Sequence, residues 1–179
     1  DIGSGAYPFP YSTVLVDKIL EPSQHRRQLF VQAGKPLVLA DIHRLPFHDK
    51  SFDFVYCSHV LEHVGQGEIV PTLKGIHRIL QSAGKLYISV PDLGVLCNLF
   101  LQPRLGPAQR FHVMRMMFGG QTDDFDLHKI GLNAEFLADY LYQAGFYRME
   151  QVEKFGLFND TSSYAPYGVP ISLNVIAIK

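Results

Sequence analysis

The sequence has few cysteines, little net charge and no long apolar run. Cys57 and Cys97 both lie in apolar context, so we expect free core thiols rather than a disulfide, and no need for an oxidising compartment. The net charge is −1, and charges of both signs are spread along the 179 residues. This argues against nucleic-acid binding through a large positive surface. No apolar run reaches the ~20 residues that span a bilayer, and no signal peptide is visible. We therefore expect a cytoplasmic protein with no integral membrane segment and no nucleic-acid partner.

The composition is that of a globular protein, with 47% hydrophobic and 18% charged residues. The length suits one domain with a full core. No internal repeat or low-complexity tract interrupts it. We therefore expect residues 1–179 to form a single domain.

Short apolar runs alternate with segments of helical spacing. The expected strands are 13–16, 37–40, 52–57, 85–90, 147–155 and 172–178. The expected helices are 23–33, with Ser23 as N-cap and Gly34 as stop, then 68–80, 93–101, 107–118 and 134–144, the last between Asn133 and Gly145. This alternation favours a parallel sheet with helices on both faces, ended by a hairpin-like antiparallel pair.

The first residue, Asp1, is typical of the end of a strand rather than of its beginning. A buried strand normally has ~5–6 residues. We therefore expect the first strand to be truncated at the N-terminus.

Polar residues follow the apolar strands at their carboxyl ends, where ligands of open α/β sheets bind. The first strand leads into Gly3-Ser4-Gly5, whose glycines let a ligand approach the backbone. Later strands are followed by Asp17, Asp41, Ser58 and Asp92. An acid after the second strand suits a ribose, because its two oxygens accept both diol protons. The glycine turn and the acids, in this order and at strand spacing, predict a nucleoside-containing cofactor. A Gly-x-Gly turn by itself would not support this prediction.

Several of these segments resemble class I S-adenosylmethionine-dependent methyltransferases. The resemblance rests on DIGSG at 1–5, Asp17, DIHRLPF at 41–47 and FDFVYCSHVLEHV at 52–64. Segments at 78–92, 118–121, 126–129 and 144–146 look like a small branch of predicted methyltransferases. The resemblance implies a Rossmann-like three-layer α/β/α sandwich. Its sheet would be mainly parallel and seven-stranded, with an antiparallel strand near the C-terminus.

The resemblance also implies where S-adenosylmethionine would bind. The methionine part would lie along Gly3, Ser4 and Gly5, and Asp17 would hold the ribose. Asp41 and Ile42 would lie at the adenine. Ser58 and His59 would lie at the sulfur end.

The interval between Gly5 and Asp17 is short for this kind of site. A nucleotide-binding turn is usually followed by a helix, with the acid ~20 residues on. Here the interval contains alternating aromatic residues and prolines that disfavour a helix: Tyr7, Pro8, Phe9, Pro10 and Tyr11. We predict an aromatic-walled loop that partly covers the cofactor. The alternative is a cropped, cofactor-poor version of the fold.

Methyl transfer mainly needs positioning of a nucleophile, and a general base helps when the acceptor is a hydroxyl or an amine. The candidate groups are His59, Glu62, His63, Asp92, Asp126 and His128. We predict that His59 and His128 are catalytic. His59 follows a strand at the sheet edge, and His128 lies in a polar loop, 121–131, that can fold over the pocket.

His59 and His63 are spaced like a pair of metal ligands. The sequence between them is His-Val-Leu-Glu-His rather than His-Glu-x-x-His, and no third ligand is obvious. We therefore predict no metal site and a structural role near a helix N-terminus.

The stretch from 104 to 118 carries two further groups that could contact a substrate. Its methionines, Met114, Met116 and Met117, could face a substrate, although a core helix is the commoner explanation. Its arginines, Arg104, Arg110 and Arg115, could hold an acidic acceptor, although a solvated face is the commoner explanation.

The leading hypothesis is a methyltransferase that acts on a small, sugar- or lipid-linked acceptor. The first alternative is a non-catalytic binding or assembly module of the same fold. The second is a nicotinamide-dependent oxidoreductase, disfavoured because Gly3-Ser4-Gly5 lacks a third glycine. Neither the acceptor nor the oligomeric state can be read from the sequence.

Overall fold

The structure is a computed structural model that describes residues 1–5, 8–18 and 35–179. Tyr7 and the helix expected at 23–33, with its caps, lie outside the described residues. The strands are β1 (Leu15–Asp17), β2 (Leu37–Leu39), β3 (Phe52–Ser58), β4 (Leu80–Pro91), β5 (Arg148–Val152) and β6 (Ser172–Ile178). The helices are α1 (Ile69–Ile79), α2 (Leu93–Phe100), α3 (Pro107–Phe118) and α4 (Ala134–Ala144). Every element expected within the described ranges is present, although β4 is longer than predicted and β5 is shorter.

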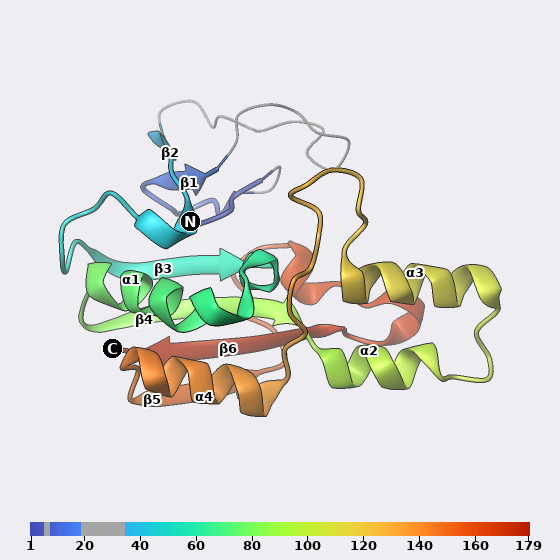
Figure 1. Cartoon of the computed structure of the whole chain (residues 1–179). Coiled ribbons are helices and arrows are strands. Elements are labelled where there is room, and N and C mark those ends of the chain that lie inside the picture. Colours follow the sequence, from blue (N-terminus) through green and yellow to red (C-terminus); the bar gives the residue numbers. More distant parts are fainter. Residues whose placement is uncertain (6–7, 19–34) are drawn as a thin grey trace.

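The strands form two sheets joined by one residue near the start of the chain (Figure 1). β1 and β2 are parallel, and the second sheet has the order β3-β4-β6-β5, with β6 antiparallel to both neighbours. Ile2 makes parallel bridges to Val16 of β1 and Cys57 of β3. The antiparallel strand near the C-terminus is therefore confirmed.

The expected seven-stranded sheet is not observed, because the described residues form six strands. The start of the chain lies between β1 and β3 in space, and there it contributes only the two bridges of Ile2. Gly3 follows with φ +67 and turns the chain away from the sheet at once.

Helices α1 and α4 pack together against one face of the larger sheet (Figure 1). The apolar residues of α1 recur at helical spacing and are at most 1% exposed: Ile69, Leu73, Ile76 and Ile79. Helix α4 begins where the Asn133 side chain accepts a hydrogen bond from the Phe136 N–H, and it ends at Gly145 in the left-handed conformation. Both predicted caps of α4 are confirmed.

The opposite face of β3 is covered by aromatic side chains from loops. Phe9 stacks on Phe54 and Tyr56, with ring centroids 5.3 and 5.5 Å away, and Phe158 packs beside them. The described residues from 8 to 14 form a loop, as predicted. Phe9 and Tyr11 of this loop do not line the cavity, which differs from the prediction. Phe9 packs on the sheet instead, and Tyr11 is 80% exposed.

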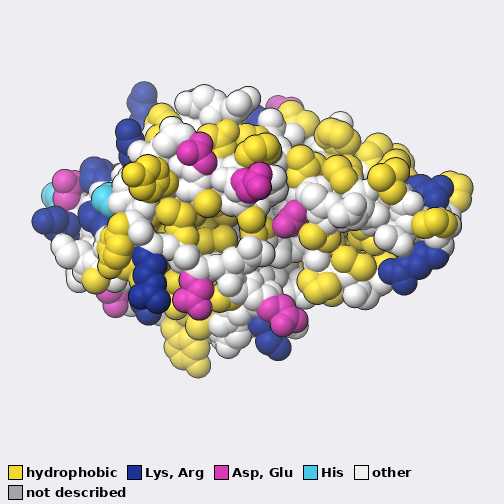
Figure 2. Space-filling view, turned by 90° about the horizontal axis from the view of Figure 1, so that it is seen from below, with side chains coloured by type: hydrophobic (Ala, Val, Ile, Leu, Met, Phe, Trp, Pro, Cys, Tyr) yellow, Lys and Arg dark blue, Asp and Glu magenta, His cyan; other side chains and the backbone are white. Residues whose placement is uncertain are grey.

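Helices α2 and α3 extend beyond the carboxyl ends of the strands and have a small core of their own. This core consists of Leu96, Leu99, Leu105, Val113 and Ile171, with Met116 and Met117 packed against it. The prediction that the methionines of α3 belong to a core is confirmed for these two. Figure 2 shows hydrophobic side chains gathered at this end of the molecule, the right-hand end of both views.

The cysteines differ in their surroundings. Both are free, but only Cys57 is buried, while Cys97 on α2 is exposed. The prediction of a core thiol is therefore wrong for Cys97, which lies on the outer side of α2.

In the described part of the chain, none of the helices combines the length and the apolar character that crossing a bilayer requires.

Candidate functional site

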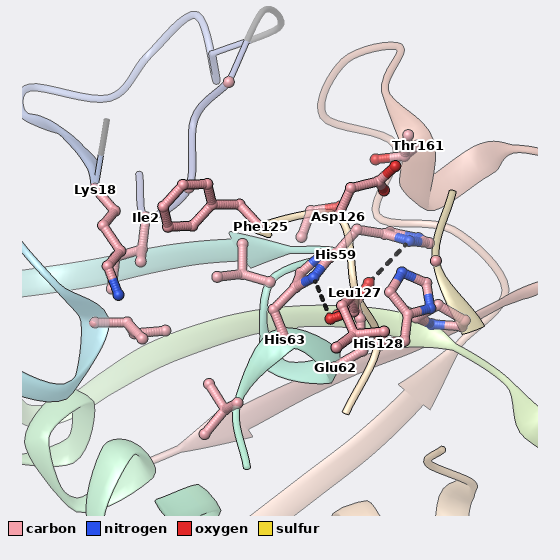
Figure 3. A pocket seen from close by; sticks show the side chains of 18 of the residues that line it. Ile2, Lys18, His59, Glu62, His63, Phe125, Asp126, Leu127, His128 and Thr161 are labelled. Atoms are coloured by element: carbon pink, nitrogen blue, oxygen red, sulfur yellow. Dashed lines mark hydrogen bonds and ion pairs between the residues drawn. The ribbon is translucent and has the colours of Figure 1, made fainter. Parts of the chain in front are cut away.

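A cavity of about 790 Å³ lies at the carboxyl ends of the strands, where open α/β sheets bind their ligands. Every residue that the sequence indicated for the cofactor lines it: Gly3, Ser4, Gly5, Asp17, Asp41, Ile42 and Ser58. His59 and His128, the predicted catalytic residues, line the same cavity (Figure 3). Asp92 does not line it. That carboxylate accepts a hydrogen bond from the Val95 N–H and caps α2.

The glycine turn and Asp17 hold each other in place. Asp17 is 3% exposed, and its Oδ2 accepts a hydrogen bond from the Gly5 N–H at 3.1 Å. Its Oδ1 accepts one from the Lys18 N–H at 2.7 Å. The carboxylate is therefore fixed at the end of β1, beside the backbone of the turn.

Gly3 has two separate reasons to be glycine. Its φ is +67, and an added Cβ would lie 2.3 Å from Cγ2 of Val60. We expect Gly3→Ala to lower the free energy of unfolding by about 2–4 kcal/mol, because left-handed strain and overpacking add. The melting temperature, followed by circular dichroism, should fall by about 5–15 °C.

The matched control for this substitution is Gly75→Ala. Gly75 lies inside α1, and nothing lies within 4 Å of its added Cβ. Alanine should stabilise that helix by about 0.5–1 kcal/mol. Equal melting temperatures for the two variants would contradict the account of Gly3.

Asp41 also lines the cavity, and it pairs with Lys18. The Lys18 ammonium is 2.7 Å from Asp41 Oδ2, while Oδ1 accepts a hydrogen bond from the His43 N–H. Burial alone would raise the pKa of Asp41, but Lys18 and His43 outweigh it and hold the pKa below its usual value. Lys18 also lies 5.8 Å from the centre of the Phe125 ring. The sequence did not indicate Lys18 or Phe125, whose partners are distant in the chain.

The polar loop between α3 and α4 closes one side of the cavity, as predicted. Gly119 has φ +81 and lies so close to Asp126 that an added Cβ would be 2.0 Å from its carbonyl oxygen. The buried Asp126 carboxylate accepts hydrogen bonds from the N–H and Oγ1 of Thr122, and the Lys129 N–H donates to the Glu62 carbonyl. These contacts fix the shape of the loop and tie it to the turn that carries Glu62.

His59 is held at the end of β3 in a left-handed conformation, with φ +54, which is uncommon for a residue other than glycine. Its Nε2 lies 2.9 Å from Ser172 Oγ, and its Nδ1 lies 3.4 Å from Glu62 Oε1. The ring is thus fixed between β6 and the turn that follows β3. Such outliers often occur at functional sites.

Glu62 is the least expected group in the cavity wall, because it is a carboxylate that is 2% exposed. It lies on the 3-10 turn Leu61–His63, which is anchored by the fully buried Leu61. Burial alone would raise the pKa of Glu62, but the imidazoles of His59, His63 and His128 outweigh it and lower the pKa.

The rings of His63 and His128 are in edge-to-face contact beside Glu62, with their centroids 4.9 Å apart (Figure 3). Burial lowers the pKa of His128 and His63 lowers it further, although the charge of Glu62 acts in the opposite direction. The structure thus brings His128 beside the turn that carries Glu62 and His63. No local spacing in the sequence indicates this contact.

The arginines of the 104–118 stretch divide between the two roles that the sequence left open. Arg104 donates to the Tyr167 carbonyl, and Arg110 donates to the carbonyls of Phe100 and Gln102. Arg115 lines the cavity. Only Arg115, of these three, is placed where it can meet a ligand.

The sequence model of a family described as methyltransferase domain matches residues 3–88. An uncharacterized protein of Methanocaldococcus jannaschii is 45% identical over 53 residues, which are 30% of this chain and 22% of the relative. The matched part therefore spans less than a quarter of that relative's length.

Solved structures of methyltransferases share the fold. A SAM-dependent methyltransferase of Thermotoga maritima, described as a possible histamine N-methyltransferase, superposes with a TM-score of 0.63 at 21% identity, covering 99% of this chain and 80% of that one. A 1,6-didemethyltoxoflavin-N1-methyltransferase of Burkholderia thailandensis, with that substrate and S-adenosylhomocysteine bound, has a TM-score of 0.56 at 17% identity, covering 93% and 60%.

The family match begins at the glycine turn and includes Asp17, Asp41 and the strand that leads to Ser58. The order of strands and helices around the cavity agrees with it. Residues 3–88 therefore match a methyltransferase-domain family, and the chain has the fold of solved S-adenosylmethionine-dependent methyltransferases.

Proposed function

We propose that this protein transfers the methyl group of S-adenosylmethionine to a small-molecule acceptor, which is a small, sugar- or lipid-linked compound. One observation carries the proposal. The glycine turn, Asp17 and Asp41 share a single cavity with a second group of polar residues around His59. A cofactor and an acceptor can therefore meet inside it.

The cofactor would lie along the strand ends. The backbone of Gly3 to Gly5 would follow its methionine part, and Asp17 would accept hydrogen bonds from the ribose hydroxyls. Its two oxygens accept the backbone N–H groups of Gly5 and Lys18, and a carboxylate oxygen can accept more than one hydrogen bond. Asp41 and Ile42 would contact the adenine, and Ser58 would lie near the sulfur.

In the reaction, a lone pair of the acceptor forms a bond to the methyl carbon while the carbon–sulfur bond breaks. The electron pair stays on sulfur, and S-adenosylhomocysteine leaves. The chain's main contribution is to position the two reactants and exclude water, for which the loop carrying Phe125 supplies one wall. A hydroxyl or amine acceptor also loses a proton. The predicted proton acceptors are His59 and His128, both of which line the cavity.

Isothermal titration with S-adenosylmethionine, S-adenosylhomocysteine and NAD tests the cofactor. We expect micromolar binding of the two sulfur compounds and none of NAD. Binding of NAD alone would overturn the proposal in favour of an oxidoreductase. Release of S-adenosylhomocysteine in the presence of sugar, lipid and small amine acceptors then separates an enzyme from a binding module. Cofactor binding without turnover on any of them would favour the module.

A further inference from the structure

Three side chains at the acceptor end of the cavity converge on one point. The Glu62 carboxylate and the imidazoles of His63 and His128 have ligand atoms that all lie within 4.8 Å of one another. Two of these residues come from the turn after β3, and the third comes from the loop between α3 and α4. The labelled side chains lie together in Figure 3.

The buried Glu62 carboxylate makes no hydrogen bond within the described part of the chain. Both of its oxygens, Oε1 and Oε2, are inaccessible to solvent. The nearest imidazole nitrogen, His59 Nδ1, is 3.4 Å away, longer than the ~2.7–2.9 Å of a charge-assisted hydrogen bond. A buried polar group without a hydrogen bond carries a desolvation cost. A cation at the point of convergence would offset that cost.

Both histidines are oriented as metal ligands usually are. His63 Nδ1 lies 3.1 Å from the Leu127 carbonyl oxygen, and His128 Nδ1 lies 3.3 Å from the Met117 carbonyl oxygen. A carbonyl only accepts hydrogen bonds, so each Nδ1 carries the proton. Each Nε2 then keeps its lone pair. Metal-bound histidines almost always donate their other ring N–H to such a group, which fixes the tautomer and the ring.

We propose that Glu62, His63 and His128 bind one divalent transition-metal ion, such as Zn²⁺ or Mn²⁺. Two imidazoles and one carboxylate are a donor set that suits these ions better than Mg²⁺, which prefers oxygen ligands and water. Three protein ligands leave at least one coordination position open, and all three residues line the cavity.

The open position indicates what the ion does, and this step rests on the proposed function. An acceptor oxygen bound there would be held near the sulfur end of the cofactor, and the ion would make its hydroxyl easier to deprotonate. With His128 on the ion, His59 remains the predicted proton acceptor. The site therefore favours acceptors with a hydroxyl or carboxyl oxygen.

Equilibrium dialysis of chelator-treated protein against Zn²⁺, Mn²⁺ or Mg²⁺, followed by elemental analysis, tests the site. We expect one Zn²⁺ or Mn²⁺ per chain and much weaker binding of Mg²⁺. His63→Gln and His128→Gln should each weaken binding at least about tenfold. His48→Gln removes an exposed imidazole outside the cavity and should leave binding unchanged. Glu62→Gln keeps the shape of the side chain and should also weaken binding.

The proposal is overturned if the parent protein binds neither Zn²⁺ nor Mn²⁺, or if His48→Gln weakens binding as much as His63→Gln does. Melting curves identify any variant that fails to fold, and the partly exposed His63 provides a variant that disturbs the core least. Titration of the metal-free protein with S-adenosylhomocysteine reports on the cofactor site separately. Failure of the metal site is therefore distinguishable from failure of the proposed function.

Discussion

Replacing Asp17 with alanine should weaken the binding of S-adenosylhomocysteine about 10- to 150-fold. This is equivalent to about 1.5–3 kcal/mol, the scale of a hydrogen bond to a charged group. The carboxylate is 3% exposed and fixed by the N–H groups of Gly5 and Lys18, so it needs no rearrangement before it binds a ribose. Isothermal titration of parent and variant measures the difference.

Two further variants separate ribose binding from other effects of the change. Asp17→Asn keeps one oxygen acceptor and should lose less affinity than Asp17→Ala. Asp53→Ala removes an exposed acid of β3 outside the cavity and should bind as the parent does. Asp17→Ala also removes the acceptor of the Gly5 N–H, which can lower the stability of the fold. The titrations should therefore be run at a temperature at which circular dichroism shows that the variant is folded. Unchanged affinity in folded Asp17→Ala would show that the ribose assignment is wrong.

The residues proposed to hold the cofactor could be placed in one cavity from the sequence, because their positions are set by local rules. A polar residue directly after a buried strand lies at the carboxyl edge of the sheet, whatever the rest of the chain does. Gly3, Asp17 and Asp41 all follow this rule, and all line the cavity. Asp92 follows the same rule and yet caps a helix. A position at a strand end therefore indicates a candidate and does not assign a role.

The contacts within the part of the cavity around His59 and His128 could not be predicted, because they join distant segments. Glu62 and His63 are adjacent in the sequence, but His128 reaches them only because the loop after α3 folds back and bonds to the Glu62 carbonyl through Lys129. The place of Phe9 was missed for a related reason. Alternation with prolines predicts a loop, but Phe54 and Tyr56 on one face of β3 decide where the ring packs.

Gly119→Ala should loosen the loop that brings His128 to the cavity while leaving the main core folded. The φ of +81 costs about 1–2 kcal/mol with a side chain present. The new Cβ would also lie 2.0 Å from the Asp126 carbonyl oxygen, so the backbone has to move. The His128 N–H donates to the Phe118 carbonyl next to this position. In the variant, we expect the amide hydrogens of residues 119–131 to exchange roughly 5- to 30-fold faster than in the parent protein, or faster still if the clash adds to the strain. Exchange in α1 and α4 should be unchanged.

Gly156→Ala distinguishes loss of the loop from conformational strain alone. Gly156 has φ +69, but nothing lies within 4 Å of its added Cβ. Alanine there carries similar strain without a clash, and exchange in 119–131 should stay as in the parent. If Gly119→Ala leaves that exchange unchanged, the loop is not held by this close approach. Gly119→Ala leaves all three proposed metal ligands unchanged. If this variant exchanges faster and also binds Zn²⁺ at least about tenfold more weakly, the fold of the loop sets the geometry of the metal site.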